Sequence, residues 1–343
     1  MNTSTIMKRV VPPALAILLA SCAPSVVATR GGGPAADPLM GDWQGHRVSS
    51  DGTVTPVAVR VIALGGASYR FNIQPSFDKR QDAQTEVTEG RLEGDRIVPT
   101  SNSLWQMSLE NGDLTGHTAR DIAVNFALRR VVRLSPNLGA RAPQGAVVLF
   151  DGTSLSGWER RDVKQRGTPA TWKLLEGGIM EVAPGSGDII TKRKFSDFQL
   201  HVEFRIPLMS EAREQARGNS GVYLHGRYEI QVLDSYGLKG EDNECGGIYQ
   251  VAAPRVNMCA PPGQWQTYDV TFHSPRFDGE GKQLKVAVAT ILHNGVVIHQ
   301  DLAIPAPTGG AIDDDVKAPG GIMLQDHGNL VQYRNIWLVE LKN

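Results

Sequence analysis

The 343-residue chain is long enough to bury more than one hydrophobic core, and its 35 basic and 36 acidic residues leave a formal net charge of −1. It contains no basic run of the kind that follows a phosphate backbone, which argues against a nucleic-acid partner. The 37 glycines and 20 prolines, with scarce helical periodicity, predict an all-β protein rich in turns.

The N-terminus predicts export from the cytoplasm. Lys8 and Arg9 lead into an apolar run over residues 10–19, which is too short to span a bilayer as a mature helix. The next residues, Leu-Ala-Ser-Cys ending at Cys22, resemble the lipobox of bacterial lipoproteins. The resemblance implies a signal peptide over residues 1–21. It also implies acyl chains on Cys22 that anchor the mature chain to a membrane of the cell envelope, in the periplasm or at the outer membrane. The alternative is a plain secretory peptide with an incidental cysteine.

Residues 22–36, which include three consecutive glycines, are expected to form a flexible tether. Export places the two remaining cysteines, Cys245 and Cys259, in an oxidising compartment. We therefore expect a disulfide between them. The alternatives are two free buried thiols, or a metal site, for which no matching histidine pair is evident.

Residues 37–135 predict a small antiparallel β domain. Residues 41–45 open it, and short apolar runs follow, separated by turns rich in glycine and aspartate: 57–64, 69–73, 86–92, 96–98, 103–109 and 124–134. Strands this closely spaced, with hairpin turns between them, predict a meander or a small barrel. Its ionisable residues are scattered, so binding or spacing is the expected role. Residues 136–144, with two prolines and a glycine, are the predicted linker.

Four segments of the remaining chain, 145–343, carry a family resemblance: "LFDGTSLSGW", "GNSGVYLHGRYEIQVLDSYG", "CGGIYQVAAPRVNMCAPPGQWQTYDVTFHSPRFD" and "IMLQDHGNLVQYRNIWLVEL". In this order they resemble the 3-keto-disaccharide hydrolase domain family. The resemblance implies a concanavalin A-like β-sandwich of the jelly-roll type and cleavage of glycosides whose sugar is oxidised at C3. The N-terminal third of the chain lies outside the resemblance.

The residue pattern predicts a sandwich independently. Residues 198–206 alternate between apolar and polar side chains, and residues 222–232 read as two strands pinched at His225, Gly226 and Arg227. Further strands are expected at 269–273, 284–292, 322–327 and 333–341, with a hairpin turn at Asn294 and Gly295.

Polar side chains gather on one face of three of these elements, which are two strands and the pinched hairpin. If the strands share one concave sheet, the side chains converge in a single groove: His201, Glu203 and Arg205; Tyr223, His225, Glu229 and Gln231; Gln325 and His327. Each also has an ordinary structural explanation. Glu203 and Arg205 can pair across strands, and Tyr223 can be an exposed strand aromatic. His225 and His327 can be turn residues, and Asn219 can hold a bend.

Cleavage of a 3-keto sugar needs acid and base groups of this kind. The ketone acidifies the C2 hydrogen, and a base that removes this hydrogen causes loss of the aglycone from C1. We expect His327 or His201 as the base, and Glu229 or Glu203 as the acid or substrate holder. The expected substrate-binding residues are Arg205, Asn219, Tyr223, Gln231 and Gln325. Arg205, or a divalent cation held by Glu and His, would stabilise the enolate. No metal-ligand spacing is recognisable, and we assign no metal or cofactor.

Two other functions use the same residues. Hydrolysis of an unoxidised glycoside needs a pair of carboxylates, and the Glu229-x-Gln231 arrangement supplies only one. A non-catalytic, lectin-like surface module would also use a polar groove to hold a carbohydrate.

Overall fold

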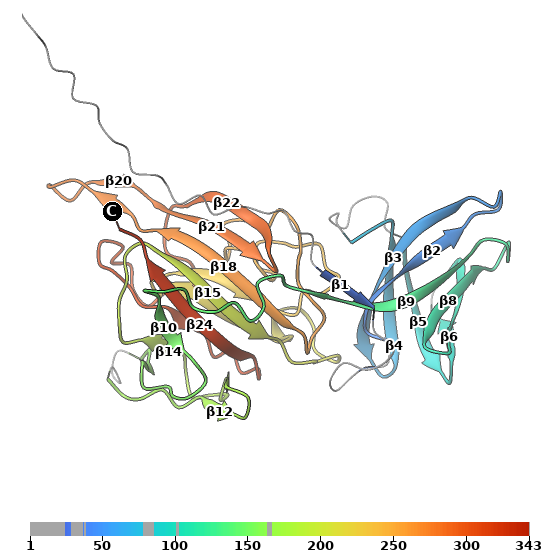
Figure 1. The fold of residues 1–343 in the computed structure, drawn as a ribbon, viewed down its shortest axis with the longest axis horizontal. Coiled ribbons are helices and arrows are strands. Elements are labelled where there is room, and N and C mark those ends of the chain that lie inside the picture. Colours follow the sequence, from blue (N-terminus) through green and yellow to red (C-terminus); the bar gives the residue numbers. More distant parts are fainter. Residues whose placement is uncertain are drawn as a thin grey trace, which may run out of the picture.

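The protein is an all-β chain that forms an N-terminal barrel and a C-terminal sandwich (Figure 1). The computed structural model describes residues 25–28, 37, 39–77, 86–100, 103–162 and 167–342. The predicted signal peptide and Cys22 lie outside these residues. No helix in the described part of the chain is long and apolar enough to cross a bilayer. The all-β fold class is confirmed.

Eight antiparallel strands close into the barrel, because the last of them pairs with both the seventh and the first. They are β2 (Gly41–Val48), β3 (Val54–Gly65), β4 (Ser68–Gln74), β5 (Glu86–Glu93), β6 (Arg96–Pro99), β7 (Trp105–Glu110), β8 (Asp113–Thr118) and β9 (Asn125–Leu134). Alternate side chains such as Trp43, Val59 and Phe71 fill the interior. The prediction of a small barrel is therefore confirmed, although β8 was not predicted.

A ninth strand, β1 (Ser25–Ala28), pairs with the end of β9, where Ser25 lies opposite Leu134. The predicted flexible tether over residues 22–36 is therefore wrong at these four residues. They form an ordered strand, because the last residues of β9 extend beyond the barrel and have unpaired backbone groups to offer.

Two antiparallel sheets make the sandwich. The larger, here called the back sheet, has the order β12-β13-β24-β15-β18-β21-β22, with β10 also on β24. The smaller, the front sheet, has the order β11-β14-β23-β16-β17. The back-sheet strands are β10 (Val147–Phe150), β12 (Lys173–Leu175), β13 (Ile179–Glu181), β15 (Phe198–Arg205), β18 (Trp265–His273), β21 (Ala287–His293), β22 (Val296–Ile304) and β24 (Gln332–Glu340). The front-sheet strands are β11 (Trp158–Arg160), β14 (Ile189–Thr191), β16 (Ser220–Leu224), β17 (Tyr228–Val232) and β23 (Met323–Leu324).

A small hairpin of β19 (Arg276–Phe277) and β20 (Gln283–Lys285) extends from the sandwich. The sandwich core lies between the two sheets. The apolar face of β15 carries Phe198, Val202 and Phe204, and the front sheet contributes Val222 and Ile230; all five are fully buried.

The pinch in the front sheet is a three-residue connection, His225 to Arg227, between β16 and β17, in which Arg227 N donates to Leu224 O at 3.0 Å. His225 and Gly226 have φ angles of 57° and 65°, and two successive positive φ values are typical of the type I′ hairpin turn. This confirms the hairpin predicted over residues 222–232 and places Glu229 and Gln231 on its second strand.

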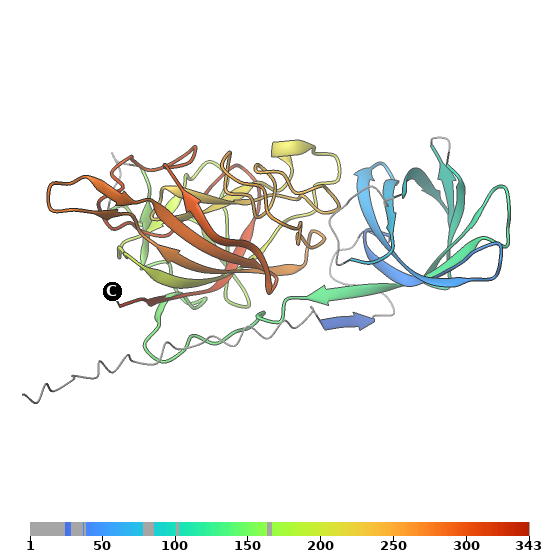
Figure 2. The same ribbon diagram turned by 90° about the horizontal axis from the view of Figure 1, so that it is seen from above.

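The predicted linker, residues 136–144, runs along the outer face of the back sheet (Figure 2). Gly139 N donates to Glu203 Oε1 at 2.6 Å, and Ala140 O accepts from Trp337 Nε1 at 3.1 Å. The linker is therefore bonded to the sandwich rather than spanning open solvent.

The predicted disulfide is not formed in this structure, where Cys245 and Cys259 are both free, buried thiols. Cys245 Sγ lies 3.2 Å from Tyr268 Oη, and Cys259 Sγ contacts Leu233 O at 3.5 Å. The structure thus matches the alternative of two free thiols in the core.

Candidate functional site

The outer face of the front sheet carries a row of side chains that ends at Glu229. The strand register places the row's residues opposite one another across all five strands: Glu159, Ile190, Met323, Tyr223 and Glu229. We call this the Glu229 row. Because side chains two residues apart share a face of a strand, a second row runs beside it.

The second row is polar and is here called the amide row: Arg161, Asp188, Gln325, Gly221 and Gln231. Arg161 N donates to Asp188 O at 2.9 Å and Gln325 N to Gly221 O at 3.1 Å, while Gly221 lies opposite Gln231. Two of the predicted substrate-binding residues, Gln231 and Gln325, therefore lie in this row, beside Glu229.

Glu229 is almost completely buried, and this burial raises the pKa of its carboxyl group to about 7. The Tyr223 hydroxyl opposes the shift by hydrogen bonding to the carboxylate, and the charge of Asp188 adds to it. No ion pair to Glu229 occurs among the described residues. A carboxyl group with this pKa exchanges protons readily near neutral pH.

The Tyr223 hydroxyl lies between several groups of the site. It is 3.0 Å from Gly309 O and 3.1 Å from Gln325 Nε2, and it also contacts the Glu229 carboxylate. Burial, together with the charge of Glu229, raises the pKa of this phenol far above its ordinary value. Tyr223 therefore stays neutral and keeps its proton as a hydrogen-bond donor.

Gly221 explains how a carboxylate fits beside the tyrosine ring. A Cβ at this position would lie 2.6 Å from Glu229 Oε1 and 2.8 Å from Tyr223 Cε2. Both distances are shorter than a real Cβ contact, so only glycine leaves the space that the Glu229 side chain occupies.

Three amide oxygens near Glu229 have no hydrogen-bond partner within the described chain: Asn219 Oδ1, Gln231 Oε1 and Gln325 Oε1. Buried polar groups are rarely left unpaired, because each one costs free energy. Oxygen acceptors of this kind match the hydroxyl donors of a sugar.

Arg161 and Asp188, at the far end of the amide row, were not predicted. Their side chains pair at 2.9 Å, and Arg161 Nη2 donates to Ala311 O at 2.7 Å. They flank three-residue strands, which are too short to show the alternation that marked the longer strands.

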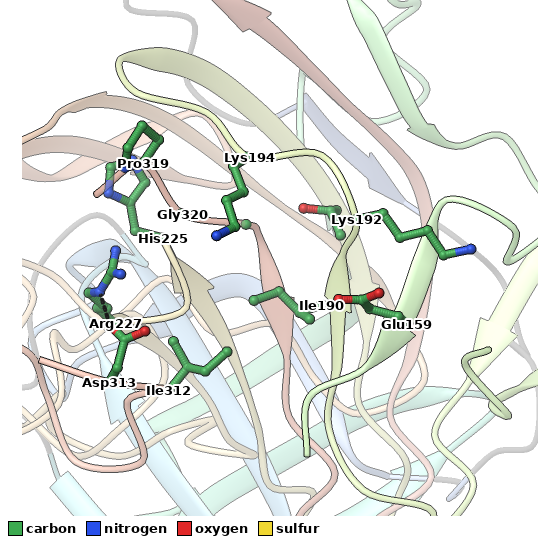
Figure 3. A pocket seen from close by; sticks show the side chains of 12 residues that line it. Glu159, Ile190, Lys192, Lys194, His225, Arg227, Ile312, Asp313, Pro319 and Gly320 are labelled. Carbon is green, nitrogen blue, oxygen red and sulfur yellow. Dashed lines mark hydrogen bonds and ion pairs between the residues drawn. The ribbon is translucent and has the colours of Figure 1, made fainter. Parts of the chain in front are cut away.

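A small pocket adjoins the other side of the Glu229 row (Figure 3). It holds about 70 Å³ and shares Glu159 and Ile190 with the row. Lys192 and Lys194 stand at its edge, and Arg227 pairs with Asp313 at 2.6 Å.

The predicted convergence of three strands in one groove is wrong for His201, Glu203 and Arg205. These residues lie on β15 in the back sheet, and their side chains point away from the core toward the linker or the sheet's outer face. The reason is that apolar alternation reveals which face of a strand is buried but not which sheet the strand joins.

His201 is held in place on the back sheet. Its Nδ1 lies 2.6 Å from Asp269 Oδ1, its Nε2 lies 3.5 Å from Glu203 Oε1, and its ring stacks on Trp337. Burial alone would lower the pKa of His201, but hydrogen bonds to Asp269 and Glu203 outweigh it and raise the pKa to about 9. The imidazole is therefore protonated at neutral pH and cannot accept another proton as a base.

Arg205 also has a structural role. It donates to Gln332 Oε1 and lies over the Trp265 ring at 4.7 Å. Its guanidinium is on the opposite sheet from Glu229, so it cannot stabilise an enolate beside that residue.

Neither of the remaining two histidines faces the Glu229 row, and His225 is a turn residue, as its structural explanation predicted. The left-handed backbone at His225 turns its ring inward, where it lies 4.7 Å from the Phe272 ring and 6.0 Å from the Phe198 ring. Burial there lowers its pKa to about 4. His327 is exposed, because β23 ends at Leu324, and it makes no hydrogen bond to the described residues.

No group of three or more His, Cys, Asp and Glu side chains with metal-binding geometry lies in the described ranges. The site as described is a single buried carboxylate, a neutral phenol and a set of amide oxygens.

Comparison with known proteins identifies the family of the sandwich. Residues 145–339 match the model of the 3-keto-alpha-glucoside-1,2-lyase-like domain. The chain is also similar to a "putative glycosyl hydrolase" from Parabacteroides distasonis ATCC 8503 solved at 2.13 Å, with 38% identity and a TM-score of 0.53. That match covers 58% of this chain and 85% of the other.

A second structure so named from the same organism, solved at 1.70 Å, is 20% identical with a TM-score of 0.40, and the match covers 58% of this chain and 95% of the other. No match was found among curated proteins. The match over residues 145–339 spans more than half of the chain and confirms the resemblance carried by the four sequence segments. The chain therefore belongs to the 3-keto-alpha-glucoside-1,2-lyase-like domain family.

Proposed function

We propose that the protein cleaves 3-keto glycosides on the outer face of the front sheet, with Glu229 as the group that removes and returns the C2 proton. The observation that carries this proposal is the pKa of about 7 for Glu229, beside three amide oxygens without partners. Such a carboxylate is about half ionised at pH 7, where a carboxyl group with an ordinary pKa would be too weak a base.

The reaction proceeds in two stages. Glu229 takes the C2 proton, the C1–O bond breaks as the enolate collapses, and the aglycone oxygen takes that proton from Glu229 as it leaves. Water then adds across the resulting enone: its oxygen bonds to C1, and Glu229 takes a proton from the water and passes it to C2. Tyr223 has a single hydroxyl proton, which it donates to Gly309 O at 3.0 Å here, so stabilising the enolate oxygen would require that proton to turn from the carbonyl to the substrate. The amide oxygens of Asn219, Gln231 and Gln325 accept hydrogen bonds from the sugar hydroxyls.

These assignments differ from the roles predicted for the histidines. His201 is protonated and lies on the back sheet, and His327 is exposed. Of the four predicted catalytic residues, Glu229 is the one whose surroundings suit proton transfer at neutral pH.

Hydrolysis of unoxidised glycosides by a carboxylate pair has less support. The second acid near Glu229 is Asp188, whose carboxylate accepts from Arg161 and from Asp326 N. A carboxylate held by a guanidinium is poorly placed to act as a general acid.

Turnover of matched disaccharides in heavy water tests the proposal. The purified protein is expected to release the aglycone from a 3-keto disaccharide, to leave the unoxidised parent intact, and to incorporate deuterium at C2 of the product. Cleavage of the unoxidised parent at a similar rate would contradict the mechanism. Binding of the 3-keto sugar without turnover would instead support the lectin-like alternative.

We also propose that the mature chain begins at Cys22 and is held to the cell envelope by lipid on that residue. The support is the lipobox-like sequence and its apolar leader. Cys22→Ala is expected to move the protein from the membrane fraction to the soluble exported fraction, measured by fractionation and immunoblotting. An unchanged membrane fraction would contradict the anchor.

A further inference from the structure

A short 3-10 turn, η2 (Glu214–Ala216), orients the amide groups next to Glu229. Its central residue, Gln215, accepts at Oε1 from Asn219 Nδ2 at 3.1 Å and from Gln231 Nε2 at 3.3 Å. Gln215 Nε2 is fixed in turn by Asn243 O at 2.8 Å. Because both amide nitrogens are turned toward Gln215, the oxygens of Asn219 and Gln231 are turned away from it, and these are two of the buried oxygens without a partner.

The barrel holds η2 at both ends through two consecutive carbonyl groups of β3. Arg213, which precedes the turn, donates from Nη2 to Leu64 O at 2.6 Å. Arg217, which follows it, donates from Nη1 and Nη2 to Ala63 O, both at 3.2 Å. Figure 2 shows this turn, in yellow, at the end of the sandwich nearest the barrel.

Arg217 also connects the turn to the strand that carries Glu229. Its Nε donates to Asp234 Oδ2 at 2.5 Å, and Asp234 N donates to Arg217 O at 3.0 Å. Asp234 lies two residues beyond the end of β17. A guanidinium can donate to the Asp234 carboxylate and to the barrel carbonyl at the same time, because its N–H donors are fixed in a planar fork. A lysine ammonium has no such fork.

The barrel is itself fixed against the sandwich by buried polar contacts. Tyr236 Oη donates to Asp42 Oδ1 at 2.6 Å, and Asn72 Nδ2 donates to Gly237 O at 2.7 Å. A Cβ at Gly237 would lie 2.6 Å from the Ile62 side chain, so the two surfaces are in close contact there. The carbonyl groups that hold η2 therefore have a defined position relative to the front sheet.

From these contacts we propose that the barrel helps to position the sugar-binding residues. Arg217 is the positioning residue that connects the barrel to the sugar-binding site. The barrel sets η2 through Ala63 and Leu64, and η2 aligns the hydroxyl acceptors through Gln215. This inference rests on the proposed function for the identity of the ligand. It gives the part of the chain outside the family match a role in substrate binding.

Steady-state kinetics of Arg217→Lys with a 3-keto disaccharide tests the link. The lysine keeps a positive charge beside Asp234 but cannot also reach Ala63 O in the same geometry. We expect KM to rise about 10-fold with kcat within about twofold, because alignment of the hydroxyl acceptors is lost while Glu229 keeps its place. Gln215→Ala is expected to give a similar rise in KM. The double variant should be no worse than either single variant, since both act through one turn.

Two further variants keep the test decisive. If Arg217→Lys does not fold, Arg213→Met breaks the other barrel contact from the exposed side of the turn and is expected to raise KM several-fold. Lys239→Met is the matched control, since it removes an exposed cation that pairs with Glu241 and does not touch β3. Additive effects of Arg217→Lys and Gln215→Ala, or an unchanged KM in Arg217→Lys, would overturn the proposal.

Hydrogen–deuterium exchange separates this proposal from the proposed function. Asn219 N–H, bonded to Asn329 Oδ1 at 2.7 Å, and Asp234 N–H are expected to exchange faster in Arg217→Lys than in the wild type. Unchanged exchange at both amides would contradict the positioning role of Arg217, even if the enzyme is active. Absence of turnover in the wild type, with faster exchange in the variant, would contradict the proposed function and leave the positioning role of Arg217 supported.

Discussion

Glu229→Gln is expected to lower kcat/KM for a 3-keto disaccharide by at least about 100-fold, as for other acid–base groups, and at the same time to stabilise the fold. The glutamine keeps the shape of the side chain but cannot carry a proton between C2 and water. In the wild type, kcat/KM should rise with pH through about 7, where Glu229 ionises, and this limb should be absent from the variant. Initial rates measured between pH 5 and 9 give both results.

The gain in stability follows from the sign of the pKa shift. The folded-state pKa of about 7 lies above the unfolded value of 4.5, so ionising Glu229 costs folding free energy that builds up as pH rises from 4.5 to 7. The cost is on the order of 3 kcal/mol at pH 8, at 1.36 kcal/mol per pKa unit. Urea unfolding of Glu229→Gln should show most of this gain at pH 8 and little at pH 4.5. The exposed Glu176→Gln is the control, and a variant that keeps more than a tenth of the activity would exclude Glu229 as the base.

Glu203→Gln is expected to have the opposite pair of effects: the fold loses about 3 kcal/mol, and turnover at a temperature where the variant is folded is nearly unchanged. The buried Glu203 carboxylate accepts from Gly139 N at 2.6 Å, Arg334 Nε at 2.7 Å and Asn335 Nδ2 at 2.8 Å. An amide can accept at only one of its two end atoms, so one of these donors is left unpaired.

The pH dependence of Glu203 also opposes that of Glu229. Burial alone would raise its pKa, but hydrogen bonds from His201, Asn335, Gly139 and Arg334 outweigh it and lower the pKa to about 2. Its stabilising effect is therefore complete above pH 4.5 and is lost as pH falls toward 2. Urea unfolding at pH 7 and pH 3 measures this dependence. A folded Glu203→Gln protein without turnover would place the chemistry on the back sheet and would contradict the front-sheet site.

The sequence predicted the local elements well because their signals are local. Alternation over residues 198–206 marked β15, and the pinch at His225 and Gly226 marked the β16–β17 hairpin. The strands β11 and β14 have three residues each, too few to show a period, and the strand predicted over residues 322–327 is only the two residues of β23. The front sheet's full width was therefore not predictable.

Only the part of the site that depends on local sequence signals was predicted. Glu229, Gln231 and Tyr223 lie on one hairpin, so their common face follows from alternation alone. Whether His201 joins them depends on which sheet β15 pairs in. That pairing is set by contacts between residues far apart in the sequence, and it places His201 on the back sheet. Gln215 lies in a loop with no pattern at all, and its part in the site depends on the barrel.

The linker and the residue before it, Ser135, form part of the sandwich's own packing. They therefore affect which residues the sandwich needs in order to fold. The family match starts at Gly145, but Ser135 Oγ lies 2.7 Å from Thr267 Oγ1 and Asn137 Nδ2 donates to Asp269 Oδ2 at 2.9 Å. A shortened chain starting at Gly145 would lose these contacts together with the backbone groups that cover Trp337. The start of the family match and the first residue bonded to the sandwich are therefore about ten residues apart, and we expect an excised sandwich to need the chain from Ser135 onward.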